Sequence, residues 1–319
     1  MAESPRPPAE RAPSGGLDAR RGAPEGVRGG VRGLDAQGYI AREGSLARVP
    51  DAFRPAVASA RDRILDAFGT RLHSAYLYGS VPRGTARVGR SDLDLLVALR
   101  EEPTDADRET ARAVDAAVDR EFPQVDGVDT LVHSRARLLS DDETYDLGWF
   151  VACLCTPLLG DDLAEYLPRY RPDSRLARGT NSDLATLLPG WRSRVEALET
   201  AAATGETGEP GKSGKPEEPE DTDRARRALV RSLSRRLVRT GFTLVMPRWN
   251  GWTSDLSEMA EVFGTYYEDR AGEMRAAALL GAEPDGDPAV LRHYVDDLGP
   301  WLAAEYARVH GTGTPQGPS

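Results

Sequence analysis

The sequence predicts an α+β protein: a small domain with a mixed sheet, residues 37–140, followed by a helical-bundle domain, residues 141–310. Two observations carry this expectation. Between residues 51 and 134, apolar residues change between helical spacing and short strand-length runs, in the order helix, strand, strand, helix, strand. Beyond that region the apolar spacing favours helices.

Three segments are too polar, or too rich in proline and glycine, to bury a core. We expect them to be disordered or flexible. They are an N-terminal tail, an insert within the helical domain, and a C-terminal tail, at residues 1–36, about 204–221 and 311–319.

The small domain begins with a helix whose apolar residues include Val57, Ile64 and Phe68. SAYLYGS and DLDLLVAL then predict two strands, a second helix follows, and VDGVDTLVHS predicts a third strand. The expected ranges are residues 51–72, 74–80, 92–99, 105–122 and 125–134.

Five helices are expected in the second domain, at residues 145–159, 181–202, 221–241, 254–267 and 288–309. Pro189 should kink or end the second, and Gly241 is a plausible C-terminal stop for the third. Asp255 and Glu258 form a capping-type start to the fourth.

Composition narrows the classes of function. The net charge of −10 and pI of about 5.1 argue against a nucleic-acid partner, which favours a basic surface, and suit a cationic small substrate better. The only cysteines, Cys153 and Cys155, lie in an apolar stretch and are expected to be core residues. No apolar run approaches the roughly 20 residues of a membrane span, and no apolar signal segment follows the N-terminus. We therefore expect a cytoplasmic protein without a membrane partner.

The candidate catalytic and phosphate-binding residues concentrate in one stretch, LYGSVPRGTARVGRSDLDLLVAL. Asp92 and Asp94 share one face of a strand, roughly 6–7 Å apart at Cα, and two carboxylates this close repel unless a cation lies between them. Mg²⁺ suits such oxygen ligands. Upstream, Gly79 allows close approach of a phosphate, and the turn with Ser80 leads into a short helix whose N-terminal amides favour anions. Arg83 lies in the same loop, where it can touch phosphate or face solvent.

This stretch resembles the signature of the polymerase-β-like nucleotidyltransferase superfamily, an apolar-Gly-(Gly/Ser) turn followed by Asp-apolar-(Asp/Glu)-apolar. Gly79, Ser80, Asp92 and Asp94 match it, and Ser91 fits the bacterial members. The resemblance covers residues 55–133 well and the helical remainder loosely. It implies two Mg²⁺ ions, an NTP donor and release of pyrophosphate.

The resemblance also implies a third carboxylate on a later strand, acting as metal ligand or general base. Asp126 and Asp129 are the candidates. Asp129 is favoured because a strand continues after it, whereas Asp126 precedes Gly127 near a turn. Only geometry can decide between them.

Arginines recur every four residues on one face of the third helix of the second domain, at Arg227, Arg231, Arg235 and Arg239. In bacterial antibiotic nucleotidyltransferases, which the chain resembles, basic residues of the helical domain reach the triphosphate. Arg231 and Arg235 are assigned that role, with a solvated basic face as the alternative.

The sequence therefore predicts an enzyme that moves a nucleoside monophosphate, with AMP from ATP favoured, to the hydroxyl of a small-molecule acceptor of the aminoglycoside type. The alternatives are a regulatory nucleotidyltransferase that modifies a partner protein and a catalytically dead nucleotide-binding module. Intact Asp92 and Asp94 argue against the dead module.

Overall fold

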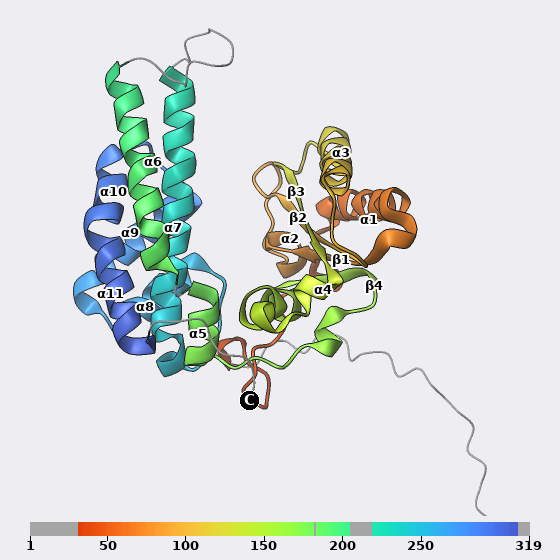
Figure 1. Cartoon of the computed structure of the whole chain (residues 1–319), viewed down its shortest axis with the longest axis horizontal. Coiled ribbons are helices and arrows are strands. Elements are labelled where there is room, and N and C mark those ends of the chain that lie inside the picture. Colours follow the sequence, from red (N-terminus) through yellow and green to blue (C-terminus); the bar gives the residue numbers. More distant parts are fainter. Residues whose placement is uncertain (1–30, 182, 205–218, 312–319) are drawn as a thin grey trace, which may run out of the picture.

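A computed structural model describes residues 31–181, 183–204 and 219–311 (Figure 1). The predicted disordered tails and flexible insert therefore lie largely outside the described residues. Residues 31–36, assigned to the N-terminal tail, are described. Leu34 pairs with Ile40 in a β-bridge and is 7% exposed, so the ordered chain begins before residue 37.

A four-stranded mixed sheet forms the first domain. Its strands lie in the order β3-β2-β1-β4; β1 runs antiparallel to both β2 and β4, and β2 runs parallel to β3. The bounds are Leu72–Tyr78 for β1, Leu93–Leu99 for β2, Val128–Ser134 for β3 and Thr156–Gly160 for β4. Together with the helical region that follows, this sheet confirms the predicted α+β class.

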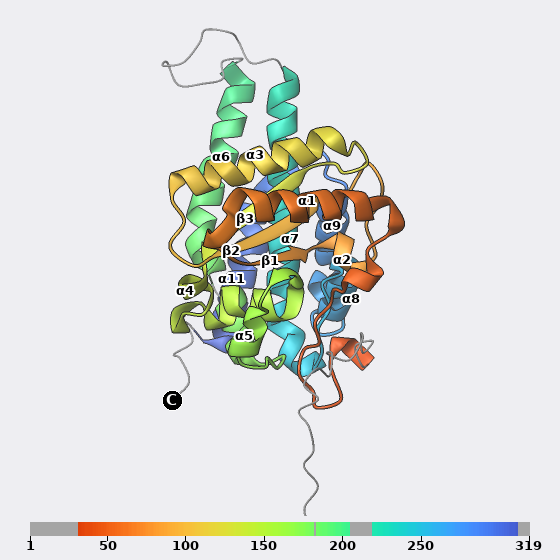
Figure 2. The same cartoon turned by 90° about the vertical axis from the view of Figure 1, so that its right-hand side faces the viewer.

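Helices α1 (Arg54–Phe68) and α3 (Asp105–Glu121) cover one face of the sheet. In Figure 2 they lie in front of the strands, with α7 of the helical domain behind. Their apolar faces and the sheet share one core that contains Ile64 and Leu95, both fully buried. The other face of the sheet is thus directed toward the helical domain. Two short helices, α2 (Ser80–Arg83) and α4 (Arg135–Leu138), follow β1 and β3.

The helix expected at residues 145–159 is only partly present. π-helical turns span residues 144–154, and the chain then becomes extended to form β4. Pro157 lacks a backbone N–H and therefore favours the end of a helix, while an edge strand tolerates it. Since β4 belongs to the sheet, the predicted boundary after residue 140 divides the first domain.

The second domain is a bundle of helices that lies beside the sheet (Figure 1). Its core centres on α7 and contains Leu237 and Phe242. The helix bounds are α5 Ser174–Asn181, α6 Leu184–Thr204, α7 Pro219–Trp249, α8 Leu256–Gly264, α9 Ala271–Ala282, α10 Pro288–His293 and α11 Gly299–His310, with a π-helical turn at Tyr294–Leu298 between the last two.

Helix α7 does not end at Gly241, so that expectation was wrong. A Cβ at residue 241 would lie 2.5 Å from Met274 Cε and 3.2 Å from Phe263 Cδ2. The small residue suits this position because α8 and α9 pack closely against α7, not because the helix stops. Helix α6 continues through Pro189, so this proline does not end it.

The start of α8 was predicted from the sequence, whereas α9 was not. Asp255 caps α8 by accepting a hydrogen bond from the Glu258 backbone N–H, which confirms the predicted start. Helix α9 was missed, because its alanine-rich sequence has little apolar periodicity. Both cysteines are free and buried, as expected.

An N-terminal strap, residues 32–45, runs along both domains. It accepts a hydrogen bond from Trp252 N–H at the Arg32 carbonyl, and its Ile40 N–H donates to the Tyr170 carbonyl. Further along, Ser45 N–H donates to the Pro82 carbonyl in α2. Among the described helices, none is long and apolar enough to cross a membrane.

Candidate active site

The turn between β1 and α2 has a backbone that only glycine adopts easily. Gly79 has φ 78° and ψ −150°. A Cβ at this position would overlap Oδ2 of Asp94 on β2. Glycine is therefore required here because the carboxylate of Asp94 lies directly against the turn.

Asp94 lies in the middle of the sheet, with Tyr78 on β1 and Asp129 on β3 as its register partners. Asp92 stands just before β2. Both aspartates line a cavity of about 650 Å³ between the domains, together with Gly79 and Ser80. The structure thus brings the predicted turn and aspartate pair together.

The two candidates for the third carboxylate are in different positions. Asp129 is in β3, directly across from Asp94. Asp126 precedes the strand, and its backbone N–H donates to the Ser91 carbonyl. The register therefore places Asp129 beside Asp94, while Asp126 lies closer to Asp92, whose pKa it raises.

Burial and like charge both disfavour ionisation in this cluster. Burial, followed by the charges of Asp92 and Asp129, raises the pKa of Asp94 to about 6. Burial and the charge of Asp126 also raise the pKa of Asp92, and Arg235 and Arg231 oppose this shift. The described part of the chain provides no hydrogen bond or ion pair to the side chains of Asp92, Asp94 or Asp129. Carboxylates that lie near one another without a cationic partner are the kind of oxygen donors that suit a hard divalent cation such as Mg²⁺.

Arginines of α7 face these carboxylates from the helical domain. Arg235 and Arg239 line the same cavity as Asp92 and Asp94, and Arg231 lines an adjoining groove of about 880 Å³. Burial, together with the charges of Arg235, Arg236 and Arg83, lowers the pKa of Arg239. Within the described residues, no carboxylate is ion-paired with Arg231, Arg235 or Arg239. Unpaired carboxylates on one wall of the cavity therefore face unpaired guanidinium groups on the other.

Comparison with known proteins identifies the first domain. Residues 60–137 match the family model of the nucleotidyltransferase domain. The match contains the Gly79-Ser80 turn, Asp92, Asp94 and Asp129.

The protein contains a nucleotidyltransferase domain.

Among solved structures, the chain is similar to a spectinomycin adenyltransferase, AAD(9), from Enterococcus faecialis, crystallised with ATP and spectinomycin. The identity is 14% and the TM-score 0.42, over 79% of this chain and 98% of that one. No curated protein sequence matches the chain significantly. A structural likeness this weak does not assign a substrate to this nucleotidyltransferase.

Two predicted residues of the nucleotidyltransferase domain are already bonded. The Arg83 guanidinium donates from Nε to the Gly79 carbonyl at 3.0 Å and from Nη1 to Ser254 Oγ, so it is held across the domain boundary. Ser91 lines the cavity, and its hydroxyl accepts a hydrogen bond of 2.9 Å from the Arg87 backbone.

Among the charged residues that line the cavity, sequence reasoning singled out neither Glu43 nor Arg239. Glu43 lies in the strap, about 50 residues before the aspartate pair, where no motif marks it. Arg239 shares the four-residue spacing of Arg231 and Arg235, so periodicity placed it on the right face but did not single it out. Its approach to Arg83 depends on how the domains dock.

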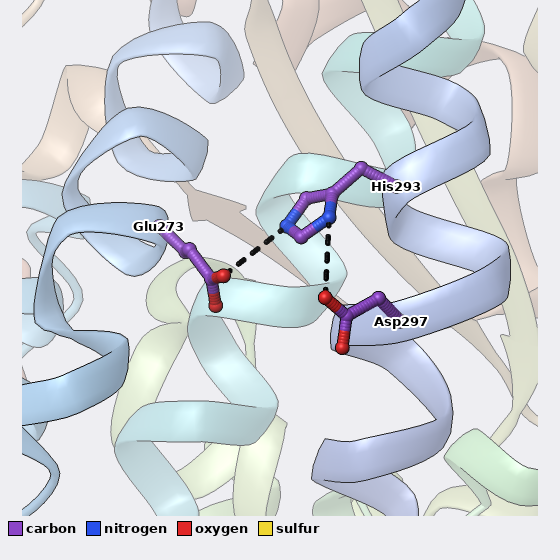
Figure 3. Close-up of side chains that lie close together, drawn as sticks. All are labelled: Glu273, His293 and Asp297. Carbon is purple, nitrogen blue, oxygen red and sulfur yellow. Dashed lines mark ion pairs between the residues drawn. The ribbon is translucent and has the colours of Figure 1, made fainter.

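A second group of potential ligands, Glu273, His293 and Asp297, lies in the helical domain (Figure 3). The two imidazole nitrogens of His293 face different carboxylates, at 3.7 and 3.6 Å. Both carboxylates are also bonded by the guanidinium of Arg270. An arginine therefore already offsets part of the negative charge of this group, which is better described as an ion-pair network between α9 and the segment formed by α10 and the π-helical turn after it.

Proposed function

We propose that this nucleotidyltransferase moves a nucleoside monophosphate, with ATP as the favoured donor, from a magnesium–NTP complex to the hydroxyl of a small-molecule acceptor. Pyrophosphate is the second product. One observation carries the proposal: the aspartate pair at β2 faces Arg235 and Arg239 of α7 in one cavity, and within the described residues none of these four side chains has an ion-pair partner. A metal-bound triphosphate would satisfy both walls at once.

Asp92, Asp94 and Asp129 are the residues that would hold Mg²⁺. When bound, Mg²⁺ neutralises phosphate charge and favours in-line displacement at phosphorus. The arginines of α7 have a different task. Arg235 and Arg239 bind the outer phosphates and stabilise the charge that develops on the departing pyrophosphate.

Asp129 is the proposed general base. It accepts the proton of the acceptor hydroxyl as that oxygen attacks the α-phosphorus. The new bond joins the acceptor oxygen to the α-phosphorus, and the bond to the bridging oxygen of pyrophosphate breaks. Asp129 is the best placed candidate because it is the register partner of Asp94 and is exposed.

The short helix α2 contributes less than its position after the glycine turn suggests. It has only four residues, so few peptide dipoles are aligned. The positive charge that attracts phosphate must come mainly from arginine side chains. The glycine turn therefore contributes the shape of the phosphate site, and the arginine side chains contribute its positive charge.

The form of the cavity supports a small acceptor. Aromatic residues Trp149, Phe150 and Trp252 line it together with the polar side chain of Asn181, and its volume of about 650 Å³ is in the range of small-molecule sites. Asp146, whose carboxylate has no hydrogen bond or ion pair within the described residues, adds negative charge to this wall. Amino-alcohols and aminoglycosides are therefore the acceptors to test first.

The deciding experiment measures pyrophosphate release with Mg²⁺ and each NTP, with and without a panel of aminoglycosides and related amino-alcohols. Asp92→Asn should abolish release. Asp105→Asn, whose side chain is 99% exposed on α3, should not change it. Full activity of Asp92→Asn would refute the metal assignment. Tight binding of magnesium–NTP, without pyrophosphate release in the presence of any acceptor of the panel, would favour a protein acceptor. Absence of nucleotide binding would favour a dead module.

A further inference from the structure

Glu43 of the N-terminal strap lies at a junction of three segments that are far apart in sequence. Its side chain is 15% exposed. One carboxylate oxygen accepts a hydrogen bond of 2.7 Å from Trp252 Nε1, and the other accepts one of 2.6 Å from Ser254 Oγ. Both donors belong to the segment between α7 and α8 of the helical domain.

The same network continues into the nucleotidyltransferase domain. Ser254 Oγ accepts a hydrogen bond from Nη1 of Arg83, whose Nε donates to the Gly79 carbonyl. Nη1 of Arg83 also lies 3.7 Å from Glu43. Two of the three guanidinium nitrogens therefore fix the direction of the side chain, and within the described residues the third, Nη2, makes no hydrogen bond.

The backbone of the strap holds Glu43 in place. Glu43 N–H donates to the Cys153 carbonyl just before β4, at 3.0 Å, and Ser45 N–H donates to the Pro82 carbonyl at 2.9 Å. A Cβ at Gly44 would lie 3.0 Å from Pro82 Cβ and would overlap Thr156 Oγ1. The strap is thus packed directly onto the turn that follows β1.

We propose that Glu43 is a positioning residue of the nucleotidyl-transfer site, which through Ser254 orients Arg83 toward the nucleotide phosphates and couples the helical domain to the Gly79–Arg83 turn. The phosphate-contact part of this inference rests on the proposed function. The coupling itself depends only on the network. Its consequence is that Arg83 is aligned for a phosphate only when the strap and both domains are docked.

The test is a double-mutant cycle on the affinity for magnesium–nucleotide, using Glu43→Gln, Arg83→Gln and the double variant. Glu43→Gln should raise the dissociation constant about tenfold, because loss of the carboxylate frees Ser254 and Arg83 to reorient. In the Arg83→Gln background, the same substitution should have little further effect. Additive losses, or an unchanged affinity in Glu43→Gln, would overturn the proposal.

Controls separate positioning from general destabilisation. Glu261→Gln removes an equally charged side chain that pairs with Arg275 on the helical domain, outside the cavity, and should leave affinity unchanged. Ser254→Ala breaks the link to Arg83 without removing a charge, and should reproduce the loss seen for Glu43→Gln. It therefore keeps the test decisive if Glu43→Gln folds poorly.

A measurement without nucleotide distinguishes this inference from the proposed function. The amides of Gly84 and Thr85 bond to the Val81 and Ser80 carbonyls in the turn. Their hydrogen exchange should be faster in Glu43→Gln and Ser254→Ala than in the wild type or Glu261→Gln. Unchanged exchange in both variants would refute the coupling. If the wild type bound no nucleotide, the proposed function would fail, while the exchange result would still decide whether Glu43 orders the turn.

Discussion

Gly79 and Asp94 are in such close contact that no side chain fits between the turn and the central strand. Gly79 directly follows Tyr78, the last residue of β1, and Tyr78 is the register partner of Asp94. The turn and the aspartate are therefore one structural unit, and each constrains what the other position can be.

Gly79→Ala should accordingly lose most nucleotidyl-transfer activity. The added methyl group must displace the Asp94 carboxylate, and the backbone at residue 79 becomes strained by roughly 1–3 kcal/mol. Gly89→Ala is the matched control, because Gly89 also has positive φ but has no atom within 4 Å of the position that its methyl group would take. Activity assays and thermal unfolding of both variants test this. Equal loss of activity in both would show that strain alone, not contact with Asp94, is responsible.

Asp94→Asn should inactivate the enzyme and stabilise the apoprotein. Because burial and neighbouring carboxylates raise the pKa of Asp94 to about 6, its ionised form opposes folding at neutral pH. Removing that charge should raise the free energy of unfolding by about 1–3 kcal/mol in EDTA. Denaturant unfolding at pH 8 measures the change. A less stable variant would contradict the picture of crowded, uncompensated carboxylates.

Asp129→Asn and Asp126→Asn should separate the two candidates for the third carboxylate. Because Asp129 lies across from Asp94, its loss should lower kcat by about 10²–10⁴-fold, with a smaller effect on nucleotide affinity. Asp126→Asn should have a minor effect, since Asp126 lies before the strand. Steady-state kinetics and nucleotide titrations of both variants give the answer, and the reverse ranking would move the proposed base to Asp126.

Arg239→Gln should weaken binding of magnesium–NTP by roughly 10- to 100-fold, the loss expected when a charged hydrogen bond to phosphate is removed. Arg227→Gln provides a control on the same helix. Arg227 is ion-paired with Asp223 at 2.5 Å, so its charge is already compensated. Calorimetric titration with a non-hydrolysable nucleotide compares the two. Similar losses would indicate a general effect of helix charge rather than a contact with the ligand.

His310 should make the helical domain sensitive to acid. Burial, opposed by its backbone hydrogen bonds, lowers the pKa of His310 below its usual 6.5. The unfolded chain therefore binds a proton more readily, and stability contributed by neutral His310 is lost as pH falls below about 6.5. Between pH 7.5 and pH 5, the free energy of unfolding should fall more for the wild type than for His310→Asn. Parallel pH profiles would contradict this assignment.

The sequence by itself determined the elements whose signals are local. The apolar runs around Gly79-Ser80 and Asp92-Leu-Asp predicted two strands and the turn between them, because strand alternation and glycine conformation depend on neighbouring residues. The same reasoning favoured Asp129. It failed at Gly241 and at β4, where close packing of α8 and α9, and pairing with β1, override the local pattern.

Only the tertiary structure decided what faces the aspartates. Arg239 and Glu43 reach the cavity from positions about 145 residues after and 50 residues before Asp94, and no spacing along the chain encodes that approach. The bonds of Arg83 to Ser254, and of Ser254 to Glu43, exist because the strap docks onto both domains. Local patterns specify a strand or a helix face, whereas electrostatic partners across a domain boundary are set by how those faces pack.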